Sequence, residues 1–161
     1  MQEKEDILSK ELKTTKRKRT RISTGYFELL ADESLQAFAN QLTYVANNPN
    51  KYSIFELSKD KTAEFIPFVI LRLQEDIDAQ DKDANIKVKM KVFSGNDLSG
   101  LDELINEGIK PNSSVQLLGE IRYVHITLGL CIVLIWAEAE AGVRQRMEGV
   151  YAIRSLCKNL R

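Results

Sequence analysis

Apolar side chains recur at steps of three and four residues along much of this chain, which is the spacing of one face of an α-helix. The clearest case lies between Asp32 and Asn47, where the apolar positions are Leu35, Phe38, Ala39, Leu42 and Val45. This spacing predicts an amphipathic helix over the same residues. Asp32 or Ser34 is the expected N-terminal cap, and the turn sequence at 47–50 ends the helix.

A second helix is predicted after this turn. It begins near Asp60 or Thr62 and ends near Gln80, because apolar residues again recur there at helical spacing. Pro67 fits only in the first turn of such a helix, where its missing N–H would have no partner anyway. A shorter helix is predicted over residues 98–108.

The C-terminal part of the chain, residues 115–160, is rich in apolar residues at helical spacing. We predict that a serine within 111–114 caps a long, mostly helical stretch that bends at residues 137–142. A rival interpretation makes residues 121–136 two buried strands that turn at Gly129. Periodicity alone does not distinguish a buried strand from a buried helix, and we favour the helix.

One segment shows the alternation of a β-strand. From Ile86 to Phe93, apolar residues alternate with Lys87, Lys89 and Lys91. One face of this strand should therefore be buried, and the other should carry three ammonium groups. In one interpretation the lysines protect an edge strand from aggregation. In the other they form a surface that faces phosphate groups.

The predicted elements define a fold class that is mainly α with a minor β component (α+β). We expect a helical domain with one or two short strands and a basic N-terminal arm. A length of 161 residues fits one domain, and no internal repeat is visible. Residues 1–24 are predicted to form the basic arm, either flexible or a short ribbon strand. Residues 25–161 are predicted to form a single compact, mostly helical domain.

Charge is unevenly distributed although its total is balanced, with 23 basic and 23 acidic residues. The segment from Lys13 to Arg21 holds six basic residues and no acidic one. β-branched residues alternate over 17–24, so extended structure is expected there. An extended arm of this length spans about 30 Å. Duplex DNA carries one negative charge per ~1.7 Å of its axis, so the arm could contact several phosphates.

Eight cations are therefore candidate nucleic-acid contacts. They are Lys16, Arg17, Lys18, Arg19 and Arg21 in the arm, and Lys87, Lys89 and Lys91 in the predicted strand. Three other interpretations of the arm stay open: a solvated tail that keeps the protein soluble, a nuclear-localisation signal, and a docking segment for an acidic protein.

The sequence offers little that supports catalysis. Its single histidine, His125, lies in an apolar context, six residues from Cys131, so on one helix the two would point to roughly opposite sides. A zinc site would need more closely grouped ligands, and no glycine loop for phosphate is present. The acidic stretch 75–83 lacks the central glycine and closing glutamate of a calcium loop. We expect no enzymatic activity, no cofactor and no metal.

The expected compartment follows from the apolar stretches and the cysteines. The N-terminus is charged where a secretory signal needs an apolar core. The longest apolar stretch, residues 128–137, is about half the ~20 residues that span a bilayer. Cys131 and Cys157 are expected to be free, buried thiols. These features predict a cytoplasmic protein with no membrane association.

The order of the basic strand and the first two helices resembles that of the ribbon-helix-helix DNA-binding proteins. Residues 16–24 would match the ribbon strand, 32–47 the first helix and 62–80 the second, although the segment between the helices is longer than in that family. The resemblance implies a homodimer whose paired ribbons enter the major groove of double-stranded DNA. The groove-facing set would be either Arg17, Arg19 and Arg21 or Lys18, Thr20 and Ile22, and the apolar Ile22 favours the arginines.

We therefore expect a DNA-binding regulatory or accessory protein that contacts nucleic acid through its basic arm. The alternative is a helical protein–protein interaction or adaptor protein with no nucleic-acid role. It is based on the apolar C-terminal half, where 128–136 has little polar relief and 143–160 forms an apolar stripe.

Overall fold

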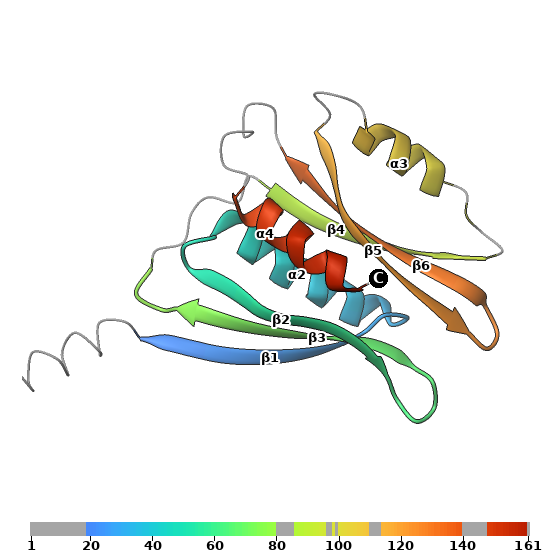
Figure 1. Cartoon of the computed structure of the whole chain (residues 1–161), viewed down its shortest axis with the longest axis horizontal. Helices are drawn as coiled ribbons and strands as arrows, with labels where there is room; N and C mark the ends of the chain where they lie inside the picture. Colours follow the sequence, from blue (N-terminus) through green and yellow to red (C-terminus); the bar gives the residue numbers. More distant parts are fainter. Residues whose placement is uncertain are drawn as a thin grey trace, which may run out of the picture.

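A computed structural model shows two three-stranded antiparallel sheets with helices between and beside them (Figure 1). It describes residues 19–79, 86–95, 98, 100–109, 114–139 and 148–160. Sheet 1 has the strand order β1 (Thr20–Glu28), β3 (Pro67–Asp76), β2 (Tyr52–Lys61). Sheet 2 has the order β4 (Ile86–Ser94), β6 (Gly129–Ala139), β5 (Val115–His125). The helices are α2 (Asp32–Asn47), α3 (Leu101–Ile109) and α4 (Glu148–Cys157), and the 3-10 helix η2 (Lys158–Leu160) follows α4.

The two halves of the chain share one topology. Each half runs strand, helix, hairpin: β1–α2–β2–β3 in the first half and β4–α3–β5–β6 in the second. In both sheets the last strand of the half lies in the centre. The first strand of each hairpin also carries a register irregularity, between Ile54 and Glu56 in β2 and between Leu117 and Gly119 in β5. The structure therefore contains the same unit twice, although the sequence shows no repeat.

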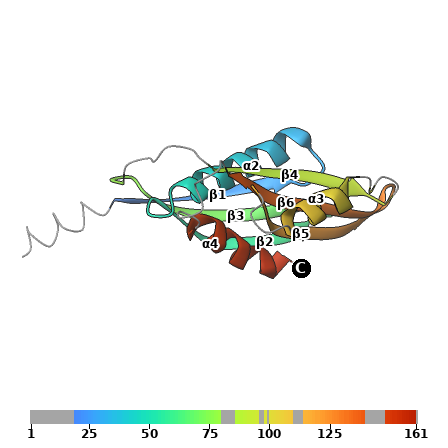
Figure 2. The same ribbon diagram turned by 90° about the horizontal axis from the view of Figure 1, so that it is seen from above.

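The elements stack in layers that alternate between sheet and helix. Helices α2 and α4 lie between the two sheets and contact strands of both (Figures 1 and 2). Their buried side chains form one core with the inner faces of the sheets, which includes Phe38, Leu71, Ile135 and Ile153. Helix α3 packs on the other face of sheet 2, over a second core around Trp136.

Helix α2 confirms the prediction from helical spacing. It covers residues 32–47, and Leu35, Phe38 and Leu42 are buried on one side. The predicted cap is wrong, because the N-cap position is Ala31 and no side chain caps it. The Ser34 hydroxyl instead accepts a hydrogen bond from the backbone N–H of Glu28 at 2.6 Å. This bond ties the end of β1 to the first turn of α2.

The predicted second helix is wrong. Residues 52–61 and 67–76 form the β2–β3 hairpin of sheet 1. Pro67 occupies the first position of β3, where a strand tolerates a residue without an N–H. From Pro67 to Leu73, every second side chain is buried, which is the period of a strand and not of a helix.

The favoured helix over 121–136 is also wrong, and the rival interpretation is confirmed. β5 and β6 form a hairpin, and Gly129 has a φ of 74°, which favours glycine. β6 is the central strand of sheet 2 and is covered on both faces. This explains its continuous apolar run, Cys131–Ala137, which carries no alternation.

Other predictions have mixed outcomes. The strand over 86–93 is confirmed as β4, and the short helix at 98–108 becomes α3. Of the C-terminal stripe, α4 and η2 are helical, while residues 140–147 lie outside the described part.

The predicted fold class, mainly α, is wrong, because strands hold more of the described residues than helices do. The predicted boundary at residue 24 falls inside β1.

Side chains from α2 cover the outer edge of sheet 2. The Asn47 amide accepts a hydrogen bond from the Ile86 N–H at 2.9 Å and donates one to the Ile86 carbonyl at 2.7 Å. The Thr43 hydroxyl accepts a bond from the Val88 N–H at 3.0 Å. These groups would otherwise be unpaired on an edge strand. α2 therefore continues the hydrogen bonding of β4 with its own side chains.

The other edge of sheet 2, strand β5, is contacted in a similar way. The Arg154 guanidinium of α4 donates to the Leu117 carbonyl at 3.1 Å. Farther along, the Lys59 ammonium of β2 donates to the Arg122 carbonyl at 3.4 Å. Both edges of sheet 2 are therefore bound by side chains of other elements.

Candidate functional site

The outer face of sheet 1 differs from the outer face of sheet 2 because no described element covers it. In sheet 2 the face that points away from the other sheet is packed under α3. In sheet 1 the corresponding face is open to solvent. Ile22 and Tyr26 of β1 lie on this face, with 66% and 65% of their surfaces exposed.

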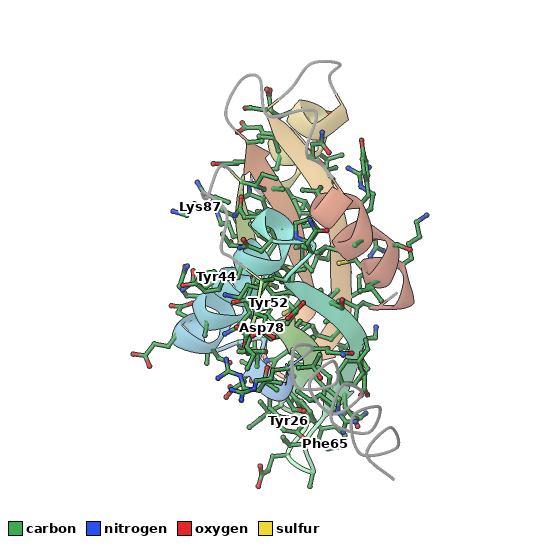
Figure 3. The ribbon with its side chains drawn as sticks, turned by 90° about the vertical axis from the view of Figure 1, so that its left-hand side faces the viewer. Tyr26, Tyr44, Tyr52, Phe65, Asp78 and Lys87 are labelled. Carbon is green, nitrogen blue, oxygen red and sulfur yellow. The ribbon has the colours of Figure 1, made fainter. Side chains whose placement is uncertain are left out.

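Four apolar side chains lie on this open face: Ile22, Tyr26, Phe68 and Ile70, here called the apolar patch. The Thr24–Arg72 pair lies between Ile22 and the other three. Tyr26 is paired with Ile70 in the register of β1 and β3. Its ring lies 6.2 Å from the Phe68 ring, centroid to centroid, in a tilted arrangement. Figure 3 shows Tyr26 at the lower end of the molecule, below Tyr44 of α2. An exposed apolar cluster that polar groups surround is a common mark of an interaction site.

The surroundings of the apolar patch are acidic. Phe68 lies between Glu28 on β1 and Asp60 on β2 in the strand register, and the three side chains share the open face. The one arginine on β3, Arg72, is paired with Glu56 at 3.1 Å. Acidic groups therefore outnumber basic ones around the patch. A polyanion would be repelled there, and a cationic partner attracted.

Strand β1 also carries the free edge of sheet 1. The Leu29 N–H donates to the Pro67 carbonyl, and the Arg19 carbonyl accepts from the Ile77 N–H. The odd-numbered residues of β1 therefore face β3, because backbone groups alternate in direction along a strand. The even-numbered residues direct their N–H and C=O groups outward. Of these, the Glu28 N–H is bonded to Ser34.

The predicted cations of the arm fall largely outside the described residues. Lys16, Arg17 and Lys18 precede the first described residue. Arg19 is exposed, and Arg21 is ion-paired with Glu75 of β3. The expectation that the apolar Ile22 faces inward is wrong. Ile22 lies on the open face, and Arg21 points to the opposite face, where Glu75 lies.

The strand lysines lie on a different surface. β4 is an edge strand as expected, and Lys87, Lys89 and Lys91 share the face of sheet 2 that carries α3. The Lys89 ammonium lies 2.8 Å from the Glu138 carboxylate, and this hydrogen bond lowers the pKa of Glu138. The Lys91 ammonium lies 5.1 Å from the centre of the Phe93 ring. The strand lysines therefore lie on a different sheet from Arg21, which belongs to β1 of sheet 1.

A cleft of about 370 Å³ lies where the β2–β3 hairpin meets β5. Its walls are mostly apolar, and the charged side chains of Lys59, Asp60, Lys61 and Arg122 also line it. Phe65 stands at the hairpin with a φ of 62°, which is uncommon for a residue with a side chain. No nucleophile with a neighbouring base lines the cleft among the described residues. The remaining lining residues are Leu29, Phe65, Pro67, Ile121, Tyr123 and Val124.

The candidate reactive residues have structural surroundings. His125 closes the β5–β6 turn, where its Nδ1 accepts hydrogen bonds from the N–H groups of Thr127 and Leu128 at 3.2 and 3.1 Å. Cys131 and Cys157 are free and buried, as predicted. Burial raises the pKa of the Cys157 thiol to about 12, so it stays protonated near neutral pH. Among the described residues, no group of three or more acids, histidines or cysteines is placed to hold a metal.

Sequence reasoning missed the apolar patch because it assigned residues 60–80 to a helix. A signal was present: Pro67, Val69, Leu71 and Leu73 alternate with Phe68, Ile70 and Arg72. Alternation at period two would have placed Phe68 and Ile70 together on the face opposite the core.

No family model matches the chain, and neither a curated protein nor a solved structure matches it. Within the described part of the chain, no helix combines the length and apolar character needed to cross a bilayer.

Proposed function

We propose that this protein is a non-enzymatic interaction protein that binds a basic, amphipathic protein segment on the open face of sheet 1. The observation that carries the proposal is the apolar patch with acidic residues around it. Tyr26 and Ile22 are two-thirds exposed on a face that the rest of the described chain leaves uncovered. A partner that covers this face would remove their apolar surface from water.

The chemistry of the patch favours a protein over a nucleic acid as the occupant of this face. Exposed aromatic rings on a sheet can stack on bases. Such platforms need cations beside the rings, and here Glu28 and Asp60 flank Phe68. The only arginine on β3 is already bound by Glu56. A lysine-rich helix or strand with one apolar side would match both the rings and the carboxylates.

The first test uses a synthetic amphipathic peptide of leucine and lysine as the probe. We expect the full-length protein to bind it and the Tyr26→Ser variant to bind it about tenfold more weakly, a loss of ~1.4 kcal/mol from one aromatic contact. Isothermal titration calorimetry measures both constants. A peptide of the same pattern built from leucine and glutamate should bind poorly, because its charge matches that of Glu28 and Asp60.

The matched control is Tyr44→Ser, which removes a tyrosine of α2 that is 55% exposed and lies away from Tyr26 (Figure 3). This variant should bind the lysine peptide as the parent protein does. Equal weakening by both substitutions, or equal binding of the two peptides, would contradict a docking site on sheet 1.

Nucleic-acid binding through the arm is a second candidate function. The observation that favours it is the run of six cations from Lys13 to Arg21, of which Arg19 is exposed at the start of β1. Because the open face is acidic, the arm would act on phosphates by itself. In this function the contact is independent of base sequence and sensitive to salt.

For this second function, we expect random duplex DNA to bind at low salt and to dissociate steeply as salt rises. The triple variant Arg17→Glu, Arg19→Glu, Arg21→Glu should reduce the slope of log K against log salt by about 2–3, or abolish binding. Fluorescence anisotropy across a salt series measures this. The matched variant Lys87→Glu, Lys89→Glu, Lys91→Glu should bind like the parent. Unchanged binding by the arm variant would exclude the arm as the contact.

A further inference from the structure

Four alternate residues on the free edge of β1 direct their backbone groups outward, and no described residue bonds to these groups. They are Thr20, Ile22, Thr24 and Tyr26, whose backbone groups point away from β3 by the alternation established above. The edges of sheet 2 are bound by Asn47, Thr43, Arg154 and Lys59. Among the described residues, no side chain forms a comparable bond to the outward backbone groups of Thr20 to Tyr26. A long, exposed edge strand is a template for pairing with another strand.

We propose that two copies of the chain pair through β1 in antiparallel orientation, about a two-fold axis at Ser23. The partner is thus a second copy of this chain, and the pairing joins two copies of sheet 1 into one six-stranded sheet. This inference is independent of the proposed function, because it uses the edge of β1 and not the open face.

The position of the axis follows from which backbone groups are free. With Ser23 opposite Ser23, Thr20 of one copy pairs with Tyr26 of the other, and Ile22 pairs with Thr24. Every free even-numbered residue then exchanges hydrogen bonds with another free residue, giving about eight bonds across the axis. Glu28 lies just beyond the paired residues. It needs no partner from the second copy for its N–H, because this group already donates to the Ser34 hydroxyl.

Charge and side-chain shape also suit self-pairing. The N-terminal end of β1 carries the exposed Arg19, and its C-terminal end carries Glu28. An antiparallel pair places each basic end beside the acidic end of the other copy, which favours this orientation over a parallel one. The central residues Ile22, Ser23 and Thr24 are small or β-branched, which strands favour.

The helices leave room for the second copy. α2 packs over the C-terminal half of β1, where Phe27 and Phe38 lie 5.1 Å apart by ring centroid. Over the N-terminal half, Arg21 and Ser23 are exposed on that same face. In the antiparallel pair, the covered half of one strand lies beside the uncovered half of the other. Each α2 then has open space above the neighbouring strand.

The test is a cysteine cross-link in the full-length protein. A pair of residues directly opposite without mutual hydrogen bonds has a Cα–Cα distance of about 4.5 Å, within the range of a disulfide. We expect Ser23→Cys to form a covalent dimer under mild oxidation, seen on a non-reducing gel and reversed by reductant. Thr24→Cys is the matched control and should form at least fivefold less. The parent protein should form none, because Cys131 and Cys157 are buried.

A charge exchange tests the same axis without oxidation. Ser23→Asp and Ser23→Lys should each be monomeric by light scattering, because like charges lie directly opposite across the axis. An equimolar mixture should recover a dimer. The proposal is overturned if the parent is monomeric at about 100 μM and Ser23→Cys does not cross-link. It is equally overturned if Thr24→Cys cross-links better than Ser23→Cys, since the axis would then lie elsewhere.

Discussion

Replacing Asn47 with leucine is expected to lower the free energy of unfolding by about 3 kcal/mol or more, although leucine is larger and more apolar. Asn47 is buried in the last turn of α2, and its amide binds both backbone groups of Ile86. Its Nδ2 also donates to the Thr43 carbonyl at 2.8 Å. Leucine would leave the N–H and C=O of Ile86 buried without these partners, at a cost of about 1–3 kcal/mol each.

Urea denaturation of the parent and the variant measures this difference. The matched control is Gln36→Leu on the same helix, where the amide is exposed and its partner is Asn40. That change should alter the free energy of unfolding by less than ~0.5 kcal/mol. If Asn47→Leu changed the free energy of unfolding by no more than that, the bonds from Asn47 to Ile86 would contribute little to stability and the prediction would be wrong.

Gly149→Ala is expected to destabilise the protein by about 2–4 kcal/mol, with the opposite sign from the usual effect in a helix. Alanine in place of glycine within a helix normally adds up to about 1 kcal/mol. Here α4 crosses α2 so closely that a Cβ at Gly149 would lie 2.5 Å from the Ala46 carbonyl oxygen and 2.8 Å from the Ala46 Cα. Both atoms belong to the main chain, so only a shift of a whole helix relieves the clash.

Thermal or urea unfolding measures the effect, and Ser155→Ala serves as the control. Ser155 is exposed on the same helix, so alanine there should leave stability unchanged or raise it by a few tenths of a kcal/mol. Because the obstacle is main chain, adding Ala46→Gly to Gly149→Ala should not restore stability. A stabilising effect of Gly149→Ala would mean that the two helices are farther apart than described.

The sequence predicted those elements whose pattern arises from a single buried face. α2 and β4 each have one side in the core, so periods of 3.6 and two residues identified both correctly. β6 has two buried faces, and its run of apolar residues carried no period to read. In β3 the apolar patch itself was misleading: Phe68 and Ile70 filled the positions that would otherwise be polar, and the mixture imitated helical spacing.

The candidate site was less predictable than the fold. The individual cations were easy to find, but their partners were distant in sequence: Arg21 meets Glu75, and Lys89 meets Glu138. The apolar patch joins β1 to β3, some 45 residues apart, so the local alternation in β3 indicates Phe68 and Ile70 but not their pairing with β1. The expected role of Ile22 failed for a related reason. Ile22 was expected to face inward because it is apolar, but it lies on the open face of sheet 1, which no described element covers.

The repeated strand–helix–hairpin unit has a consequence for what the open face can accept. The first unit carries its helix on the side toward the second unit, and the second unit carries its helix on its far side. The two units are therefore stacked in the same orientation. The open face of sheet 1 corresponds to the face of sheet 2 that packs against α2 and α4. Because the corresponding face of sheet 2 packs against helices, we expect a partner of the open face of sheet 1 to be helical as well. A ligand that docked there as an α-helix would extend the alternation of layers by one more step.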